Sequence, residues 1–433
     1  MIAALGIFGS FFFYFLIGSF LPIKRSFSLS EVLFRNFAYS LFISWGLVSI
    51  FHFTFFEYNI TPIIVIWGVI NFYFFRKNTS TINISKGEIY GLIGLTFSIL
   101  YLILILQSKA AYTSIFSFGD DVASWNSWAV ELTENNYTPY NTAYPILLPG
   151  LWSLIYRFQG SNEIWVFAKA SLIFQPIIIS IGLSYLFVLG KKVSALLLGI
   201  VTFYFFIVLH HKYMMLGYMD IPVAVMILVA GISICTVIVS VNKKEESSII
   251  NNRLVVSAIL CGLAAITKQP GVIMIFVFVV LLVVLRAHRV IFINKNKRVL
   301  LCLFAPLGAY LLMYYSFEKN IFGNLEVLEG LVNKRAKEEN LILHGYSQIL
   351  KASNKYYLWA LFVIGLSNLL NYRRLNGQMG LAFLMFAFLG FVLFSDCCAY
   401  HYRNSLWIYS LLMCSAIFAF FRIDRVVLPS INE

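Results

Sequence analysis

The chain has 433 residues, of which 60% are hydrophobic, 17% aromatic and only 12% charged. An ordinary soluble domain carries about 25% charged residues, and no water-soluble core absorbs this much apolar surface. A net charge of +13 would suggest nucleic-acid binding in a soluble protein, but here the basic residues concentrate in short loops between apolar runs. The composition therefore indicates a membrane protein and argues against nucleic acid as a partner.

Apolar runs of about 20 residues recur along the whole chain, each long enough to cross roughly 30 Å of hydrocarbon as a helix. Strand-like alternation is missing, so the spans are expected to be helical. We predict an all-α, polytopic transmembrane bundle of about thirteen spans. In chain order they lie near residues 2–22, 35–55, 61–75, 88–107, 163–189, 193–210, 217–241, 254–267, 271–285, 299–316, 356–371, 378–394 and 404–421.

The lysine and arginine residues predict the orientation of the bundle. Most of the 32 basic residues fall in alternate connecting segments, and short cytoplasmic loops of membrane proteins are enriched in such residues. This bias puts the N-terminus outside and two long polar segments, 108–162 and 317–355, on the same outer side. The expected cytoplasmic segments lie near residues 23–35, 76–87, 190–192, 242–253, 286–298, 372–376 and 422–433.

Two adjacent carboxylates, Asp120 and Asp121, follow the fourth expected span. Acidic groups near a bilayer surface are costly to desolvate, and a pair that shares a site is suited to general-base chemistry. The structural alternative is that one of them caps the helix expected over residues 125–132. The two roles are compatible, since a cap also fixes the direction of a carboxylate.

Apolar residues at spacings of three and four predict two amphipathic helices in the first outer segment. Trp125, Trp128 and Leu132 form one apolar face, and the series from Leu147 to Leu154 forms the other. We expect both helices to lie on the membrane surface.

Asp220 is the main candidate among the later polar residues. It opens the seventh expected span within the run Gly217–Pro222, and an ionisable residue in that position is a functional candidate. His210 and His211 lie shortly before it on the same expected side. Snorkelling to the membrane interface is the competing explanation for the adjacent Lys212.

Two cations are candidates for binding a phosphate group. Lys268 lies in the run Thr267–Gly271 between two expected spans, where it could also belong to a simple turn. Arg403 lies beside His401 near the last span, and its fixed fork of donors suits phosphate, with surface anchoring as the alternative. No spacing matches a zinc site or a Ser-His-Asp triad, so no metal is assigned.

Three motifs within residues 118–271 resemble the GT-C superfamily of polytopic glycosyltransferases, which includes aminoarabinose transferases and protein O-mannosyltransferases. The acidic pair, the Trp-rich helix and Tyr144–Pro149 resemble the first outer loop of that family. Tyr218–Pro222 resembles its second acidic site, and Ala264–Gly271 resembles its Thr-Lys-x-x-Gly segment. This chain departs from the family in two ways. The family commonly has Asp-Glu where this chain has Asp-Asp. The family usually has one span before the loop, whereas three extra spans are expected here.

The resemblance implies a single GT-C-like domain over residues 1–433. Residues 1–87 would be extra N-terminal spans, 88–285 a catalytic-module-like part, and 286–433 variable C-terminal spans with the outer loop 317–355. The resemblance places the protein in a bacterial inner or plasma membrane, with the active site on the periplasmic or extracellular side.

The resemblance also implies transfer of a sugar from a polyprenyl-phosphate donor to a hydroxyl of a glycan, lipid or protein acceptor. Asp120 is the expected base, with Asp121 and Asp220 assisting. Lys268, Arg403, His210 and His211 are expected at the phosphate, and Trp125, Trp128 and Tyr144 at the sugar. No cofactor is assigned, and a divalent cation stays open. An O-antigen polymerase or ligase and a flippase for lipid-linked glycans are the competing classes.

Overall fold

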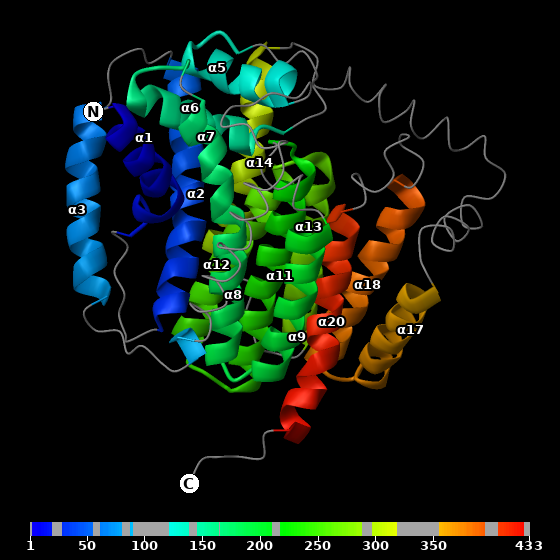
Figure 1. The fold of residues 1–433 in the computed structure, drawn as a ribbon. Coiled ribbons are helices and arrows are strands. Elements are labelled where there is room, and N and C mark those ends of the chain that lie inside the picture. The colour runs from blue at the N-terminus through cyan, green and yellow to red at the C-terminus, as the bar shows by residue number, and fades with distance from the viewer. Residues whose placement is uncertain are drawn as a thin grey trace, which may run out of the picture.

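The computed structural model describes residues 2–19, 28–54, 61–79, 87–89, 121–137, 145–163, 165–209, 217–287, 297–317, 355–394 and 406–427. Every regular element within these residues is a helix, which confirms the all-helical prediction for this part of the chain. Most of the long helices stand side by side as a bundle (Figure 1).

The N-terminal half begins with α1 (Ile2–Phe11) and η1 (Phe12–Leu16), and the following elements are α2 (Leu29–Thr54), α3 (Thr61–Thr79), η2 (Asp121–Asn126), α5 (Ser127–Thr133), α6 (Leu147–Gln159), α7 (Val166–Ala170), η3 (Ser171–Ile173), α8 (Phe174–Val188), α9 (Lys192–Thr202) and η4 (Phe203–Leu209). The C-terminal half contains α11 (Asp220–Asn242), α12 (Ser247–Ala265), η5 (Gln269–Val272), α13 (Ile273–Ala287), α14 (Lys297–Phe317), α17 (Lys355–Leu370), α18 (Leu375–Phe394) and α20 (Leu406–Val427).

Several helices have the length and composition of membrane spans. Large apolar side chains such as Ile66 and Leu301 point outward, as expected for a surface that faces lipid. These features indicate a membrane protein, while thirteen spans remain a prediction. Among the described residues, six helical segments are long and apolar enough to cross a membrane: Leu29–Thr54, Val166–Val188, Asp220–Asn242, Ser247–Ala265, Gln269–Ala287 and Lys297–Tyr314.

Two helices begin earlier than the apolar pattern predicted. α2 begins at Leu29 rather than near residue 35, and α12 begins at Ser247 rather than near residue 254. At the start of α2, the backbone N–H of Glu31 donates to Oγ of Ser28 over 3.2 Å, which is one half of a capping box. As a result, Glu31 and Arg253 lie within helices rather than in loops.

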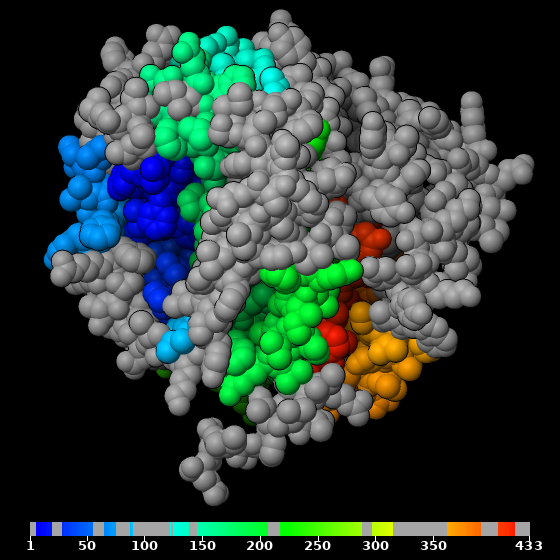
Figure 2. Space-filling view, viewed as in Figure 1, coloured from blue at the N-terminus to red at the C-terminus, as the bar shows by residue number. Residues whose placement is uncertain are grey.

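Helix α11 forms the centre of the bundle. Every side chain from Asp220 to Ser240 is buried, and α11 packs against α8, α12 and α20. A Cβ atom on Gly231 would lie 2.1 Å from Sγ of Cys414 in α20, so glycine permits this close approach. Figure 1 places α11 among the other helices, and in Figure 2 the blue N-terminal helices and the orange C-terminal ones lie at opposite edges of one face.

Helices α5 and α6 cover one end of the bundle, which we call the α5–α6 end (Figure 1). The prediction of helices in this segment is confirmed, and α6 is buried within the protein, while its place at a membrane surface stays a prediction. Arg157 is its one side chain that is not fully buried, and α6 packs against α1, α2 and α5. The reason is that α6 itself carries large apolar residues such as Trp152 and Phe158, which are fully buried, so it has no broad polar face to present to water.

Candidate functional site

Asp220 and Lys268 form an ion pair at the α5–α6 end. Asp220 is the first residue of α11, and Lys268 follows the end of α12. Nζ of Lys268 lies 2.5 Å from Oδ1 of Asp220, and the side chains are 13% and 4% exposed, respectively. Since buried charges are stable only when they are paired, the two sequence motifs meet at a buried, charge-compensated contact.

The turn that carries Lys268 is held by short-range contacts. Oγ1 of Thr267 donates to the carbonyl of Leu263 over 2.9 Å, and the N–H of Gly271 donates to the carbonyl of Lys268 over 2.8 Å. A Cβ atom on Gly271 would lie 1.8 Å from the carbonyl oxygen of Ala264. The Thr-Lys-x-x-Gly pattern therefore has a local cause, because the glycine lets the chain fold back against the end of α12.

The start of α6 is tied to the same turn through its backbone. The N–H of Leu147, at the start of α6, donates to the carbonyl of Ile266 over 3.0 Å. Ile266 lies two residues before Lys268 in the chain. The start of α6 thus lies directly beside the turn that holds the lysine.

Polar contacts join η2, α5 and α6 to one another. The hydroxyl of Tyr156 in α6 donates to Oδ1 of Asn126 in η2 over 2.5 Å. Nη2 of Arg157 donates to the carbonyl of Leu132 over 2.5 Å and to Oδ1 of Asn135 over 2.7 Å. Burial raises the pKa of the Tyr156 phenol and lowers the pKa of Arg157. These contacts join η2, α5 and α6 into one layer at the α5–α6 end, where the ion pair lies.

Trp125 and Trp128 lie in this layer and pack on each other. Their ring centroids are 4.9 Å apart in an edge-to-face arrangement, and both side chains are 4% exposed. This geometry gives the two indoles a packing role. A role in stacking on a sugar ring remains a prediction.

Several of the predicted site residues fall outside the described part of the chain: Asp120, Tyr144, His210, His211 and Arg403. Asp121 is the first residue of η2, and its side chain is likewise not described. Of the predicted residues, Asp220 and Lys268 are brought into direct contact. Within the described ranges, no three His, Cys, Asp or Glu side chains form a group that could hold a metal ion.

No family model, curated protein or solved structure matches this chain. The functional assignment therefore rests on its own residues and their geometry.

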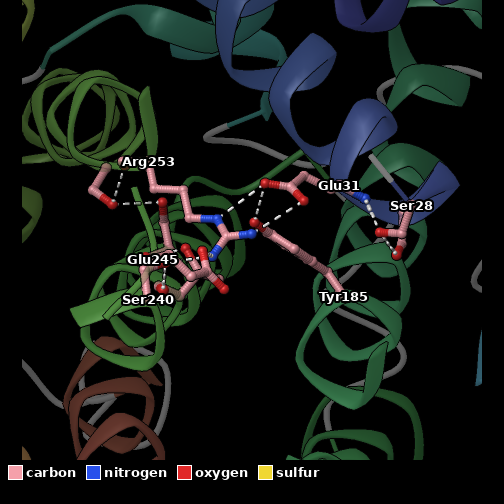
Figure 3. A network of polar contacts seen from close by, with 10 residues as sticks. Ser28, Glu31, Tyr185, Ser240, Glu245 and Arg253 are labelled. Carbon is pink, nitrogen blue, oxygen red and sulfur yellow. Dashed lines mark hydrogen bonds and ion pairs between the residues drawn. The ribbon is translucent and has the colours of Figure 1, made fainter. Parts of the chain in front are cut away.

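A second buried charge cluster lies at the opposite end of the bundle, and the sequence pattern did not predict it (Figure 3). Arg253 of α12 donates from Nε to Oε1 of Glu31 in α2 over 3.0 Å, and from Nη1 to Oε2 of Glu245 over 2.7 Å. The same Nη1 also donates to Ser240 of α11. The hydroxyl of Tyr185 in α8 donates to Oε1 of Glu31 over 2.5 Å.

The sequence contains one signal for this cluster. Ser28 and Glu31 have the spacing of a capping box, which predicts a helix start and moves Glu31 out of the loop. The positive-inside rule assigns Arg253 to a cytoplasmic loop, because basic residues concentrate there. Its acidic partners come from separate parts of the chain, so no local pattern reveals the pairing.

Proposed function

We propose that this chain is a polytopic membrane glycosyltransferase of the GT-C type that uses a polyprenyl-phosphate-linked sugar. The observation that carries the proposal is the buried contact between Asp220 and Lys268 at the end covered by η2, α5 and α6. A carboxylate and an ammonium group held there, beside the segment that follows Asp120, are the groups that transfer from a sugar phosphate requires.

The distribution of basic residues supports an outer active site. The end opposite to the ion pair carries the basic turns after α8, α11 and α17. The side chains of Asn242 and Asn376 are hydrogen-bonded over 2.9 Å and join the end of α11 to the start of α18, next to two of these turns. Because basic turns mark the cytoplasmic side, the ion pair would face outward. The described basic residues of these turns are Lys191, Lys243, Lys244, Arg373 and Arg374.

An outer active site favours a lipid-linked donor. Sugar nucleotides are made in the cytoplasm, so a sugar must be carried across on a lipid before it can react outside. A polyprenyl phosphate carrier also supplies a phosphate leaving group, whose developing negative charge needs cations such as Lys268 and Arg403.

The proposed reaction is a single inverting displacement. The acceptor hydroxyl oxygen bonds to the anomeric carbon while the bond from that carbon to the phosphate oxygen breaks. The hydroxyl proton passes to Asp120, and polyprenyl phosphate leaves. In this scheme Asp121 orients the acceptor, and Asp220 holds Lys268 in position.

The test is a transfer assay with the full chain reconstituted in lipid nanodiscs. A panel of synthetic polyprenyl-phosphate sugars is offered with hydroxyl acceptors, and a glycosylated product is expected from at least one combination. Asp120→Asn should lower transfer by about 100-fold or more with normal expression. Glu246→Gln, an exposed acid at the opposite end, is the matched control and should retain full transfer.

The same purified protein, reconstituted in proteoliposomes, separates the competing classes. A flippase would move a fluorescent lipid-linked glycan between leaflets of a proteoliposome without forming a product. A polymerase or ligase would accept a pyrophosphate-linked oligosaccharide and not a monophosphate-linked sugar. Either result would contradict the proposed transferase.

A further inference from the structure

The charge cluster around Arg253 joins four helices at the end opposite to the Asp220–Lys268 pair. Its members come from α2, α8, α11 and α12, with Glu245 in the connection between α11 and α12. Figure 3 shows the guanidinium group between Glu31 and Tyr185 on one side and Glu245 and Ser240 on the other. We call Glu31, Tyr185, Ser240, Glu245 and Arg253 the Arg253 cluster.

The Arg253 cluster is largely withdrawn from solvent. The side chains of Arg253, Glu31 and Glu245 are 9%, 13% and 21% exposed. Nη2 of Arg253 also donates to Oε2 of Glu31 over 3.2 Å, so the guanidinium group bridges both carboxylate oxygens of Glu31. Such a two-pronged contact fixes the relative position of α2 and α12.

A pocket adjoins the cluster between the same helices. Its empty volume is about 420 Å³ including the open space at its mouth. Glu31, Tyr185 and Arg253 line it together with Ser233 and Thr236 of α11. Ser233 and Thr236 are each 1% exposed, so the part of the pocket that they line is closed to solvent.

Hydroxyl groups continue from the cluster along the interface between α11 and α12. Ser240 donates to the carbonyl of Thr236 over 2.9 Å, and Thr236 donates to the carbonyl of Ser233 over 2.7 Å. Ser233 and Ser257 lie 2.7 Å apart, and Ser257 donates to the carbonyl of Arg253 over 2.9 Å. The interface between α11 and α12 next to the cluster therefore offers water hydrogen-bonding groups inside an otherwise apolar bundle.

We propose that the Arg253 cluster is an ionic latch that closes this end of the bundle, and that releasing it admits water to the pocket lined by Ser233 and Thr236. Glu31 reaches the guanidinium group of Arg253 only while α2 stays against the α11–α12 pair, whereas Glu245 lies on the same side of that interface as Arg253. Loss of Glu31 removes the contact that ties α2 to α12, and loss of Arg253 leaves two carboxylates without their cation; in both cases the remaining charges are hydrated once α2 separates from the pair. The latch acts independently of the sugar chemistry at the other end.

The experiment measures how fast a cysteine at position 236 reacts. The variant Thr236→Cys, in which the neighbouring free Cys235 is also replaced (Cys235→Ala), is treated, in detergent solution, with a small water-soluble methanethiosulfonate reagent, and modification of the peptide that contains position 236 is followed by mass spectrometry. With the latch intact, we expect slow modification. Adding Glu31→Gln or Arg253→Gln should accelerate it by about tenfold or more.

Two further variants make the result decisive. Arg373→Gln removes a basic residue from the same end without touching the cluster, and modification should stay slow. Arg253→Lys keeps the charge but loses the fork of donors, so it should accelerate modification even if the glutamine variants do not fold. Fast modification in the parent Thr236→Cys protein, or unchanged rates in every folded latch variant, would overturn the proposal.

Discussion

Nζ of Lys268 lies 2.5 Å from Oδ1 of Asp220, although the two residues are 48 positions apart in the chain. The contact joins the first residue of α11 to the turn after α12, so these neighbouring helices are tied by charge at one end. The Arg253 cluster ties the same two helices at the other end. A phosphate that binds Lys268 must therefore share it with Asp220 or displace that carboxylate.

Changing Asp220 should separate phosphate binding from turnover. In Asp220→Asn the carboxylate no longer competes for Lys268, so we expect polyprenyl phosphate to bind about tenfold more tightly while transfer slows. Lys268→Gln should bind the lipid about tenfold more weakly. The measurement is the ligand-dependent rise in melting temperature of each purified variant. A change of affinity in the same direction for both variants would contradict the competition.

Gly271 should tolerate no side chain. In Gly271→Ala the new Cβ would meet the carbonyl of Ala264, so the turn must shift and displace Lys268. We expect a loss of about 1–3 kcal/mol in the free energy of unfolding, together with reduced transfer. Gly308→Ala in α14 is the control, since a Cβ atom added there would meet nothing within 4 Å and its stability should not fall.

The hydrogen bond between Tyr156 and Asn126 should stabilise the outer layer. Tyr156→Phe leaves the buried Asn126 oxygen without this donor and should cost about 1–3 kcal/mol in thermal unfolding. Tyr204→Phe, at an exposed position, is the comparison and should change little. If both substitutions have the same effect, the contact with Asn126 is not what stabilises the layer.

Alkaline pH should weaken the same contact. Burial raises the pKa of Tyr156 in the folded state above its unfolded value, so the phenol stabilises the fold fully below the unfolded pKa of about 10. That contribution is lost as the pH rises above this value. A pH series of melting temperatures should therefore fall more steeply above about pH 10 for the parent protein than for Tyr156→Phe. Identical slopes would exclude the tyrosine as the titrating group.

The two ends of the bundle should label from opposite sides of the membrane. Glu163→Cys lies beyond α6, at the α5–α6 end, and Lys244→Cys lies in the turn after α11. In intact cells, a membrane-impermeant maleimide should modify position 163 and not position 244, which should react after permeabilisation. Labelling of both positions from one side would reverse or remove the proposed topology.

The helical class and the meeting of Asp220 with Lys268 at one end could be read from the sequence, because apolar run length and alternating basic loops are local signals. The early start of α12 could not, since Arg253 interrupts the apolar pattern that defines a span. For α2 the one local signal is the capping-box spacing of Ser28 and Glu31, because Glu31 likewise interrupts the apolar pattern. The charges of Glu31 and Arg253 become compatible with burial because α2 and α12 pack together and bring them into contact. The burial of α6 escapes prediction for a related reason, because amphipathic spacing does not distinguish a bilayer surface from a protein interior.

The central position of α11 has a consequence for biogenesis. Sγ of Cys414 approaches the carbonyl of Ile227 at 4.0 Å across a separation of 187 residues, and Gly231 leaves room for that neighbour. If α11 spans the membrane, we expect it to enter the bilayer long before α20 is synthesised, with its glycine-bearing side facing acyl chains in the meantime. Assembly of the last helix must displace those acyl chains, so a nascent chain that stops short of α20 would present a ready surface to quality-control proteases.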